Sequence, residues 1–80
     1  MISCQAYDYI EIVCMYRYPI TLTMRSGDSI ECTALDTQQN IAREECIKVD
    51  VDSVEKLVEL DTIAQLDVRV ENPHFKSISF

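Results

Sequence analysis

The residues with the strongest potential for chemistry are four cysteines, at positions 4, 14, 32 and 46, and the single histidine, His74. Cysteine and histidine together could hold a structural zinc ion or form a nucleophile pair. Structural zinc sites usually show closely spaced C-x-x-C pairs, and this chain has none. We therefore expect no metal site and no cofactor, and we expect Cys14, Cys32 and Cys46 to be small buried apolar side chains.

No catalytic set is recognisable among the remaining residues. Nothing in the sequence brings a cysteine to His74, which follows Pro73 near the C-terminus. Gly27 is the only glycine, so a glycine-rich phosphate loop is absent. Acid–base pairs cannot be distinguished from a solvated acidic surface. We predict that the chain is not an enzyme. What remains is a set of acidic surface residues, Asp8, Glu11, Asp36, Glu44 and Glu45.

The balance of charge narrows the class of partner. The 80 residues carry 14 Asp+Glu against 7 Lys+Arg, a formal net charge of −7. Proteins that bind nucleic acid directly normally present a basic stripe to the phosphates, so direct nucleic-acid binding is not expected. A basic protein, or one that itself holds nucleic acid, is a better partner. On composition alone, solubility is the simpler explanation of these charges.

Neither a membrane segment nor an export signal is evident. No apolar run approaches the roughly 18 residues of a membrane helix, and the first residues lack a basic segment that leads into an apolar stretch. We therefore expect a cytoplasmic protein with reduced cysteines and no membrane partner. At this length we expect residues 1–80 to form a single, monomeric domain.

One helix is predicted near the N-terminus, over residues 6–16. Apolar residues recur at helical spacing from Tyr7 to Cys14, while Asp8 and Glu11 share another face. The helix must end before the following proline, because the residue that precedes a proline avoids helical angles. We expect Asp8 and Glu11 to lie in the first turns, where negative charge is favourable to the helix dipole.

Apolar and polar residues alternate from residue 20 onward, which is typical of strands with one buried face. The segment Ser26-Gly27-Asp28 predicts a tight hairpin, since glycine readily adopts a positive φ. Residues 37–45 are polar and predict a long loop of the kind that often carries function. The tail, residues 74–80, is expected to add a short edge strand or to fray. The predicted strands cover residues 20–25, 29–35, 46–51, 54–60 and 66–71.

A short helix followed by about five short antiparallel strands predicts a mainly β fold. Exposed strand edges favour aggregation, so a sheet that rolls up is preferred. We therefore predict a small Sm-like (SH3-like) barrel that is capped at one end by the N-terminal helix. An OB-fold fits less well, because its helix usually lies between the third and fourth strands, where this chain has too short a gap.

The N-terminal residues also resemble a known family. The pattern C-x-x-Y-D-x-L-E-x-A-C, which opens the bacterial Rho-binding antiterminators (Rof), is matched by Cys4, Tyr7, Asp8, Glu11 and Cys14. Gly27 and Asp28 match the hairpin turn of the family, and Asp36 falls where the family carries an aspartate after its second strand. The resemblance extends over about residues 3–70 and is most specific at the N-terminus.

The resemblance implies an Sm-like barrel that binds the transcription termination factor Rho, a hexameric RNA helicase. Each Rho subunit carries a basic, aromatic primary RNA-binding site in its N-terminal domain. A protein of this family would occupy that site, block RNA loading and suppress Rho-dependent termination. An Sm-like RNA-binding module and an acidic adaptor for another basic partner stay open as alternatives. The residues expected to contact Rho are Tyr7, Asp8, Glu11, Asp36, Asn40, Glu44 and Glu45.

Overall fold

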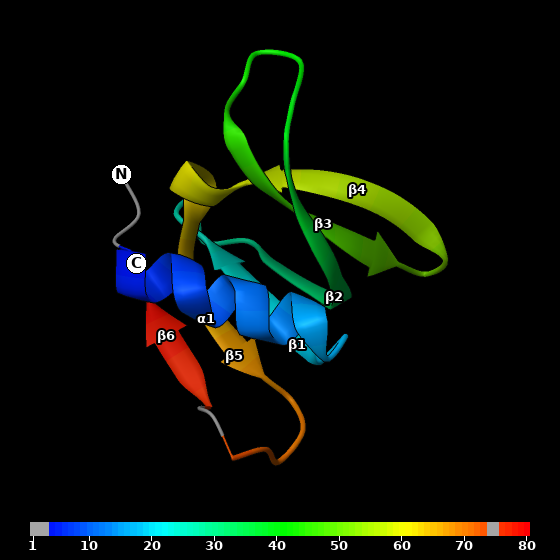
Figure 1. Cartoon of the computed structure of the whole chain (residues 1–80), viewed down its shortest axis with the longest axis vertical. Helices are drawn as coiled ribbons and strands as arrows, with labels where there is room; N and C mark the ends of the chain where they lie inside the picture. Colours follow the sequence, from blue (N-terminus) through cyan, green and yellow to red (C-terminus); the bar gives the residue numbers. More distant parts are fainter. Residues whose placement is uncertain (1–3, 74–75) are drawn as a thin grey trace.

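The computed structural model describes residues 4–73 and 76–80, in which one helix packs against a strongly bent antiparallel sheet (Figure 1). The sheet order is β4-β3-β2-β1-β5-β6. The mainly β fold class with an N-terminal helix is confirmed, with six strands rather than about five. The elements are α1 (Cys4–Met15), β1 (Pro19–Met24), β2 (Ser29–Gln39), β3 (Glu45–Val51), β4 (Val54–Glu59), the 3-10 helix η1 (Leu60–Thr62), β5 (Ile63–Val68) and β6 (Ser77–Ser79).

The bend of the sheet is concentrated in β2, its longest strand. The first part of β2 pairs with β1 and the second part pairs with β3. The register with β3 shifts between Ala34 and Asp36, and such a bulge bends a strand and increases its twist. The edge strand β4 is also connected to β5 through η1, where the Arg25 amide, just after β1, donates to the Thr62 carbonyl at 2.8 Å. The sheet therefore curls around one core.

The core lies between α1 and the concave face of this sheet. From the helix, Ile10 and Val13 are fully buried, as the helical spacing predicts. Burying one such side chain stabilises the fold by about 1.5–3 kcal/mol. The predicted burial of Cys14, Cys32 and Cys46 is confirmed. The sheet and η1 contribute further fully buried residues, among them Ile20, Leu22, Ala34, Ile47, Val49, Leu60, Ile63 and Leu66.

The helix starts earlier than predicted, at Cys4 rather than at residue 6, and it contains no acidic residue in its first turn. The dipole role predicted for Asp8 and Glu11 is therefore wrong, since the effect is confined to the first turn. The sequence does carry a start signal that the prediction did not use, because Ser3, a residue type favoured directly before a helix, precedes Cys4.

The helix ends through its own backbone rather than only because a proline follows. The Tyr18 amide donates to the Val13 carbonyl at 3.0 Å, and the Arg17 amide donates to the Cys14 carbonyl at 3.2 Å. This pair of bonds is the Schellman motif, which requires a left-handed residue after the helix. Arg17 takes that place with φ 54°, where glycine is the usual choice.

Two strand boundaries differ from the prediction. The expected loop over residues 37–45 is largely strand, because β2 continues to Gln39 and only residues 40–44 form the turn. This part of the hairpin projects from the core, so most of its side chains are exposed and no apolar alternation marks it. The last long strand is Ile63–Val68 rather than 66–71, and Val70, expected inside, is 39% exposed.

The remaining strand predictions are closer to the structure. The fourth strand ends at Glu59 instead of residue 60, because Leu60 begins η1. Its pairing with β3 is regular, so the adjacent apolar residues Leu57 and Val58 mark no bulge, and only Val58 is buried. The tail does form a short edge strand, Ser77–Ser79, which pairs with β5.

Candidate functional site

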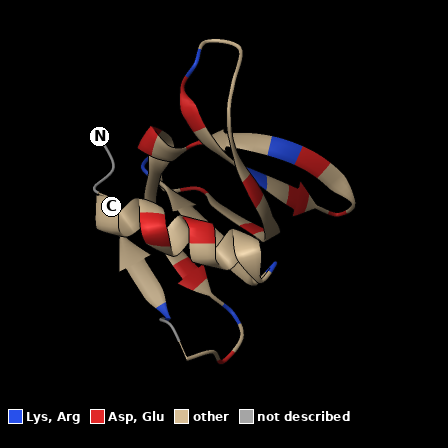
Figure 2. Cartoon of the chain, viewed as in Figure 1, with Lys and Arg blue, Asp and Glu red and all other residues tan. Residues whose placement is uncertain are grey.

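The exposed face of α1 carries two carboxylates, Asp8 and Glu11, one helical turn apart. Figure 2 shows two acidic bands along the ribbon of α1, and both side chains are exposed. The helix is oriented by its buried side chains, chiefly Ile10 and Val13, which turn the acidic positions outward. Among the described residues, neither carboxylate has a hydrogen-bond or ion-pair partner, so both are available to an external cation.

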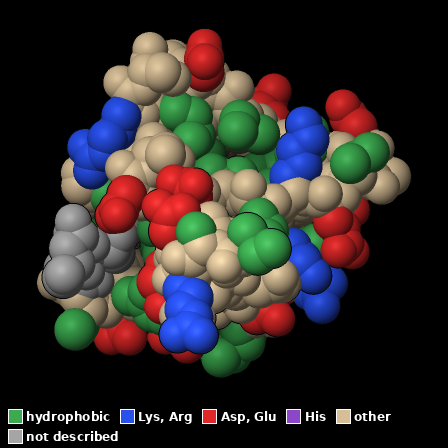
Figure 3. Space-filling model, turned by 90° about the horizontal axis from the view of Figure 1, so that it is seen from above, with side chains coloured by type: hydrophobic (Ala, Val, Ile, Leu, Met, Phe, Trp, Pro, Cys, Tyr) green, Lys and Arg blue, Asp and Glu red, His purple; other side chains and the backbone are tan. Residues whose placement is uncertain are grey.

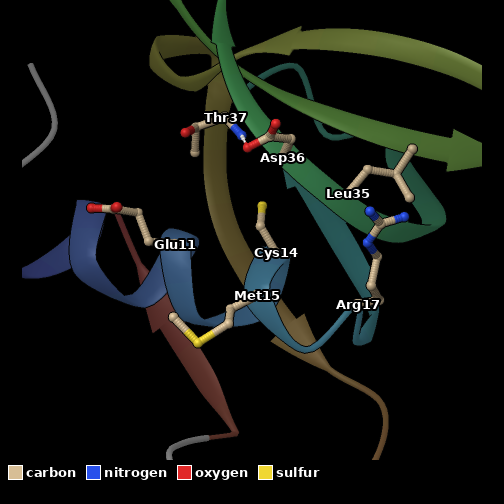
Figure 4. Close-up of a pocket in the computed structure, with 7 residues that line it drawn as sticks. All are labelled: Glu11, Cys14, Met15, Arg17, Leu35, Asp36 and Thr37. Atoms are coloured by element: carbon tan, nitrogen blue, oxygen red, sulfur yellow. Dashed lines mark hydrogen bonds between the residues drawn. The ribbon is translucent and has the colours of Figure 1, made fainter.

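A hollow of about 380 Å³ lies between the C-terminal half of α1 and β2. Asp36 stands at its β2 side, where the bulge in β2 re-aims the strand, and the Thr37 amide donates to Asp36 Oδ1 at 2.8 Å. Glu11 lies at the helix side, so the hollow is bordered by two carboxylates from distant parts of the chain (Figure 4). The hollow is lined by Glu11, Cys14, Met15, Arg17, Leu35, Asp36 and Thr37.

The floor of this hollow is the Cys14 thiol, which points from α1 toward β2 (Figure 4). Burial, together with the nearby carboxylates Asp36 and Glu11, raises the pKa of this thiol to about 12, while the Arg17 guanidinium acts in the opposite direction. A thiol with this pKa stays protonated near neutral pH and is a poor nucleophile. The chemistry available in the hollow is therefore electrostatic rather than covalent, with Glu11 and Asp36 attracting a cation and Arg17 offsetting part of their charge.

The turn at residues 40–44 is built around the Asn40 side chain. Its Oδ1 accepts from the amides of Ala42 at 3.0 Å and Glu44 at 2.9 Å, and its Nδ2 donates to Glu44 Oε1 at 3.1 Å. The backbone adds a bond from the Asn40 amide to the Glu44 carbonyl at 3.0 Å, and Arg43 adopts φ 64°. Asn40, predicted as a partner contact, thus uses its side chain to shape the turn.

Glu45 links this turn to the helix. The Tyr7 hydroxyl donates to Glu45 Oε2 at 3.4 Å, and Gln39 Nε2 donates to Glu45 Oε1 at 3.2 Å. Both oxygens of Glu45 therefore have partners within the protein, whereas those of Asp8 and Glu11 have none within residues 4–73 and 76–80. The half-buried Tyr7 ring also packs against the core, so this contact holds α1 and the β2–β3 hairpin together.

The structure thus brings most of the predicted site residues together in pairs. Tyr7 meets Glu45, Asn40 meets Glu44, and Glu11 shares a hollow with Asp36, while Asp8 stands beside Glu11 on the helix. The sequence prediction did not include Gln39, which orients Glu45, nor Cys14 as the floor of the hollow. If the predicted second strand had been extended from residue 35 to residue 39, the cross-strand pair Gln39–Glu45 would have been evident from the sequence.

Neither a metal-binding cluster nor a membrane-spanning helix occurs in the part of the chain that the structure describes. Within residues 4–73 and 76–80, no group of three or more His, Cys, Asp or Glu side chains could hold a metal ion. In the same ranges no helix has the length and apolar character needed to cross a membrane. His74, weighed in the sequence as a zinc ligand or catalytic base, lies outside the described residues.

Comparison with known proteins connects this arrangement to one family. The family model described as "Modulator of Rho-dependent transcription termination (ROF)" matches residues 1–80. Among solved structures, YaeO bound to magnesium from Vibrio cholerae O395 is similar, with 39% sequence identity and a TM-score of 0.87 over 92% of this chain and 96% of that chain. No curated protein matches the chain. The chain belongs to the ROF family, the modulators of Rho-dependent transcription termination.

Proposed function

We propose that this protein binds the N-terminal domain of Rho, covers its primary RNA-binding site and thereby suppresses termination. The observation that carries the proposal is a pair of exposed carboxylates, Asp8 and Glu11, which share one helix face and have no partner among the described residues. Carboxylates that point outward can form charge-assisted hydrogen bonds with Lys or Arg, in place of the phosphates that those residues otherwise hold. The ROF family assignment supports Rho as the source of the basic surface.

The long-range charge of the protein favours the same partner. A net charge of −7 on 80 residues attracts the protein toward a basic groove and chiefly raises the association rate. The same charge repels RNA phosphates, which is unfavourable for a module that binds RNA directly. Attraction between exposed charges is screened by salt, so binding should weaken as the salt concentration rises.

The hollow beside Glu11 extends the proposed contact surface. Asp36 adds a third carboxylate from β2, the Cys14 floor is neutral, and the Arg17 guanidinium, which also lines the hollow, offsets part of the negative charge. A basic side chain of Rho that enters this hollow would meet Glu11 and Asp36 together. Glu45, by contrast, is held by Tyr7 and Gln39, and in this proposal it keeps the hairpin in place beside the helix.

Competition for RNA tests the proposal. Intact Rho that carries fluorescent oligo(C) in its primary site is titrated with the protein. The expected result is release of the oligonucleotide once the protein is in molar excess over the Rho subunits. A parallel titration of oligo(C) or oligo(U) with the protein alone should show no binding. If the protein binds Rho equally well while oligo(C) saturates the site, occlusion is wrong, and RNA binding by the free protein would favour an RNA-binding module instead.

A further inference from the structure

The hollow between α1 and β2 contains a cation of its own. Arg17 lines it together with the carboxylates Glu11 and Asp36. In the view of Figure 4, the Cys14 thiol lies between Glu11 and Arg17. The charge of Arg17 reaches the floor of the hollow, because it acts to lower the pKa of the Cys14 thiol, which the two carboxylates act to raise. A cation that enters the hollow therefore meets a repulsion as well as an attraction.

The backbone fixes Arg17 at the edge of this hollow in an unfavourable conformation. The bonds that end α1, from the Tyr18 amide to the Val13 carbonyl and from the Arg17 amide to the Cys14 carbonyl, hold Arg17 directly after the helix. Its φ of 54° is left-handed, a conformation that glycine adopts without steric cost. Strained residues of this kind cluster at sites where the side chain has a role, so the guanidinium is the part of Arg17 that needs an explanation.

The Arg17 guanidinium is exposed and has no hydrogen bond or ion pair within residues 4–73 and 76–80. Two other basic side chains are paired at 3.5 Å, in the ion pairs Lys48–Glu55 and Arg69–Glu31. On the face seen in Figure 3, basic side chains lie apart from one another, with acidic side chains among them. An isolated surface cation is thus ordinary in this protein, and what distinguishes Arg17 is that it lines the hollow.

We propose that Arg17 is a specificity-determining residue, which lowers the affinity of the hollow for cations in general and leaves its Glu11 side to a cation that the partner holds in place. This inference rests on the proposed function and deepens it, because it names what the partner must present. A net charge of −7 attracts any basic protein, and selectivity then requires an element that repels the wrong partners. A Lys or Arg fixed opposite Glu11 avoids Arg17, whereas the cations of a flexible chain do not.

Charge removal at Arg17 tests the inference with two partners, intact Rho and a flexible oligolysine peptide. Arg17→Gln keeps a non-glycine residue at the same φ and removes only the charge. Its affinity for oligolysine at low salt should rise about three- to sixfold, because a repulsion between unit charges roughly 4–7 Å apart in water is lost. Its affinity for Rho should change less than twofold. Arg17→Lys keeps the charge and should bind both partners as the unsubstituted protein does.

The matched control is Lys56→Gln on the edge strand β4. Lys56 is exposed and lies outside the hollow, and its substitution changes the net charge by the same amount as Arg17→Gln. Lys56→Gln should strengthen oligolysine binding only slightly. A double-mutant cycle locates the effect, because the gain from Arg17→Gln should shrink when Glu11→Gln is also present. Equal gains for Arg17→Gln and Lys56→Gln, or a gain that Glu11→Gln leaves undiminished, would overturn the inference.

The remaining outcomes separate this inference from the proposed function. If the unsubstituted protein does not bind Rho, the proposed function fails, whereas the oligolysine series still decides whether Arg17 repels cations. If Rho gains as much affinity as oligolysine, or if Arg17→Gln weakens binding to Rho, Arg17 does not provide selectivity and the inference is wrong. A cation directly after a helix also favours the helix dipole. A lower Tm for Arg17→Gln with unchanged oligolysine binding would therefore assign Arg17 to the helix alone and overturn the inference.

Discussion

Reversal of one charge on the exposed helix face is the most direct test of where the protein meets its partner. Glu11→Lys changes a residue that has no partner within the described structure and that borders the hollow opposite Asp36. Lysine and glutamate have similar helix propensities, so α1 should form unchanged. The expected consequence is a large loss of affinity for Rho without a loss of folding stability.

The magnitude follows from the exposure of the site. Two unit charges about 4 Å apart in water-like surroundings attract by about 1 kcal/mol, and reversal removes this attraction and adds a repulsion of the same size. The Kd of Glu11→Lys should therefore rise about 30-fold at low salt. Because exposed charges are screened beyond a Debye length of about 8 Å at physiological ionic strength, the loss should become smaller as salt is added.

The assay is a measurement of Kd on immobilised Rho at several salt concentrations, with Glu71→Lys as the matched control. Glu71 is also exposed, and its substitution changes the net charge by the same amount, but it lies between β5 and β6, away from the hairpin (Figure 1). Glu71→Lys should alter only the long-range attraction and therefore weaken binding slightly. Equal losses for the two variants would refute a local contact at Glu11, and so would an unchanged Kd for Glu11→Lys.

Four further outcomes are expected from the core and the turns. With its pKa raised from 9.0 to about 12, the Cys14 thiol should alkylate about a thousandfold more slowly than an unperturbed thiol, and peptide mapping that finds Cys14 labelled before the exposed Cys4 would contradict this. Because the unfolded chain loses the Cys14 proton first, the free energy of unfolding in urea should fall as pH rises above 9.0, whereas a constant value would argue against the raised pKa. Gly27→Val forces a β-branched residue to φ 101° and should cost about 1 kcal/mol or more, which an unchanged Tm would disprove. Ile10→Ala leaves a cavity under α1 and should cost about 2–5 kcal/mol in denaturant unfolding, and a smaller loss would show that the helix contributes little to the core.

Features that depend on local periodicity were predictable from the sequence. Alternation from residue 20 identified β1 and the first part of β2, with Ile20, Leu22, Cys32 and Ala34 inside, because side chains of a strand point to opposite faces in turn. The helical spacing likewise places Asp8 and Glu11 on one face whatever surrounds the helix. The same reasoning failed for the outer half of the β2–β3 hairpin, where exposure of most side chains leaves no pattern to read.

The sequence alone therefore determined the sign of the net charge and which residues are acidic, whereas the tertiary structure decided the roles of these residues. The contact of Tyr7 with Glu45 spans 38 residues and exists only because α1 packs beside the hairpin. Asp36 borders the same hollow as Glu11 because a bulge changes the register of β2. Local sequence does not encode such long-range register, so only the folded chain separates Glu45, which is held by Tyr7 and Gln39, from the two helix carboxylates that have no partner in the part of the chain that the structure describes.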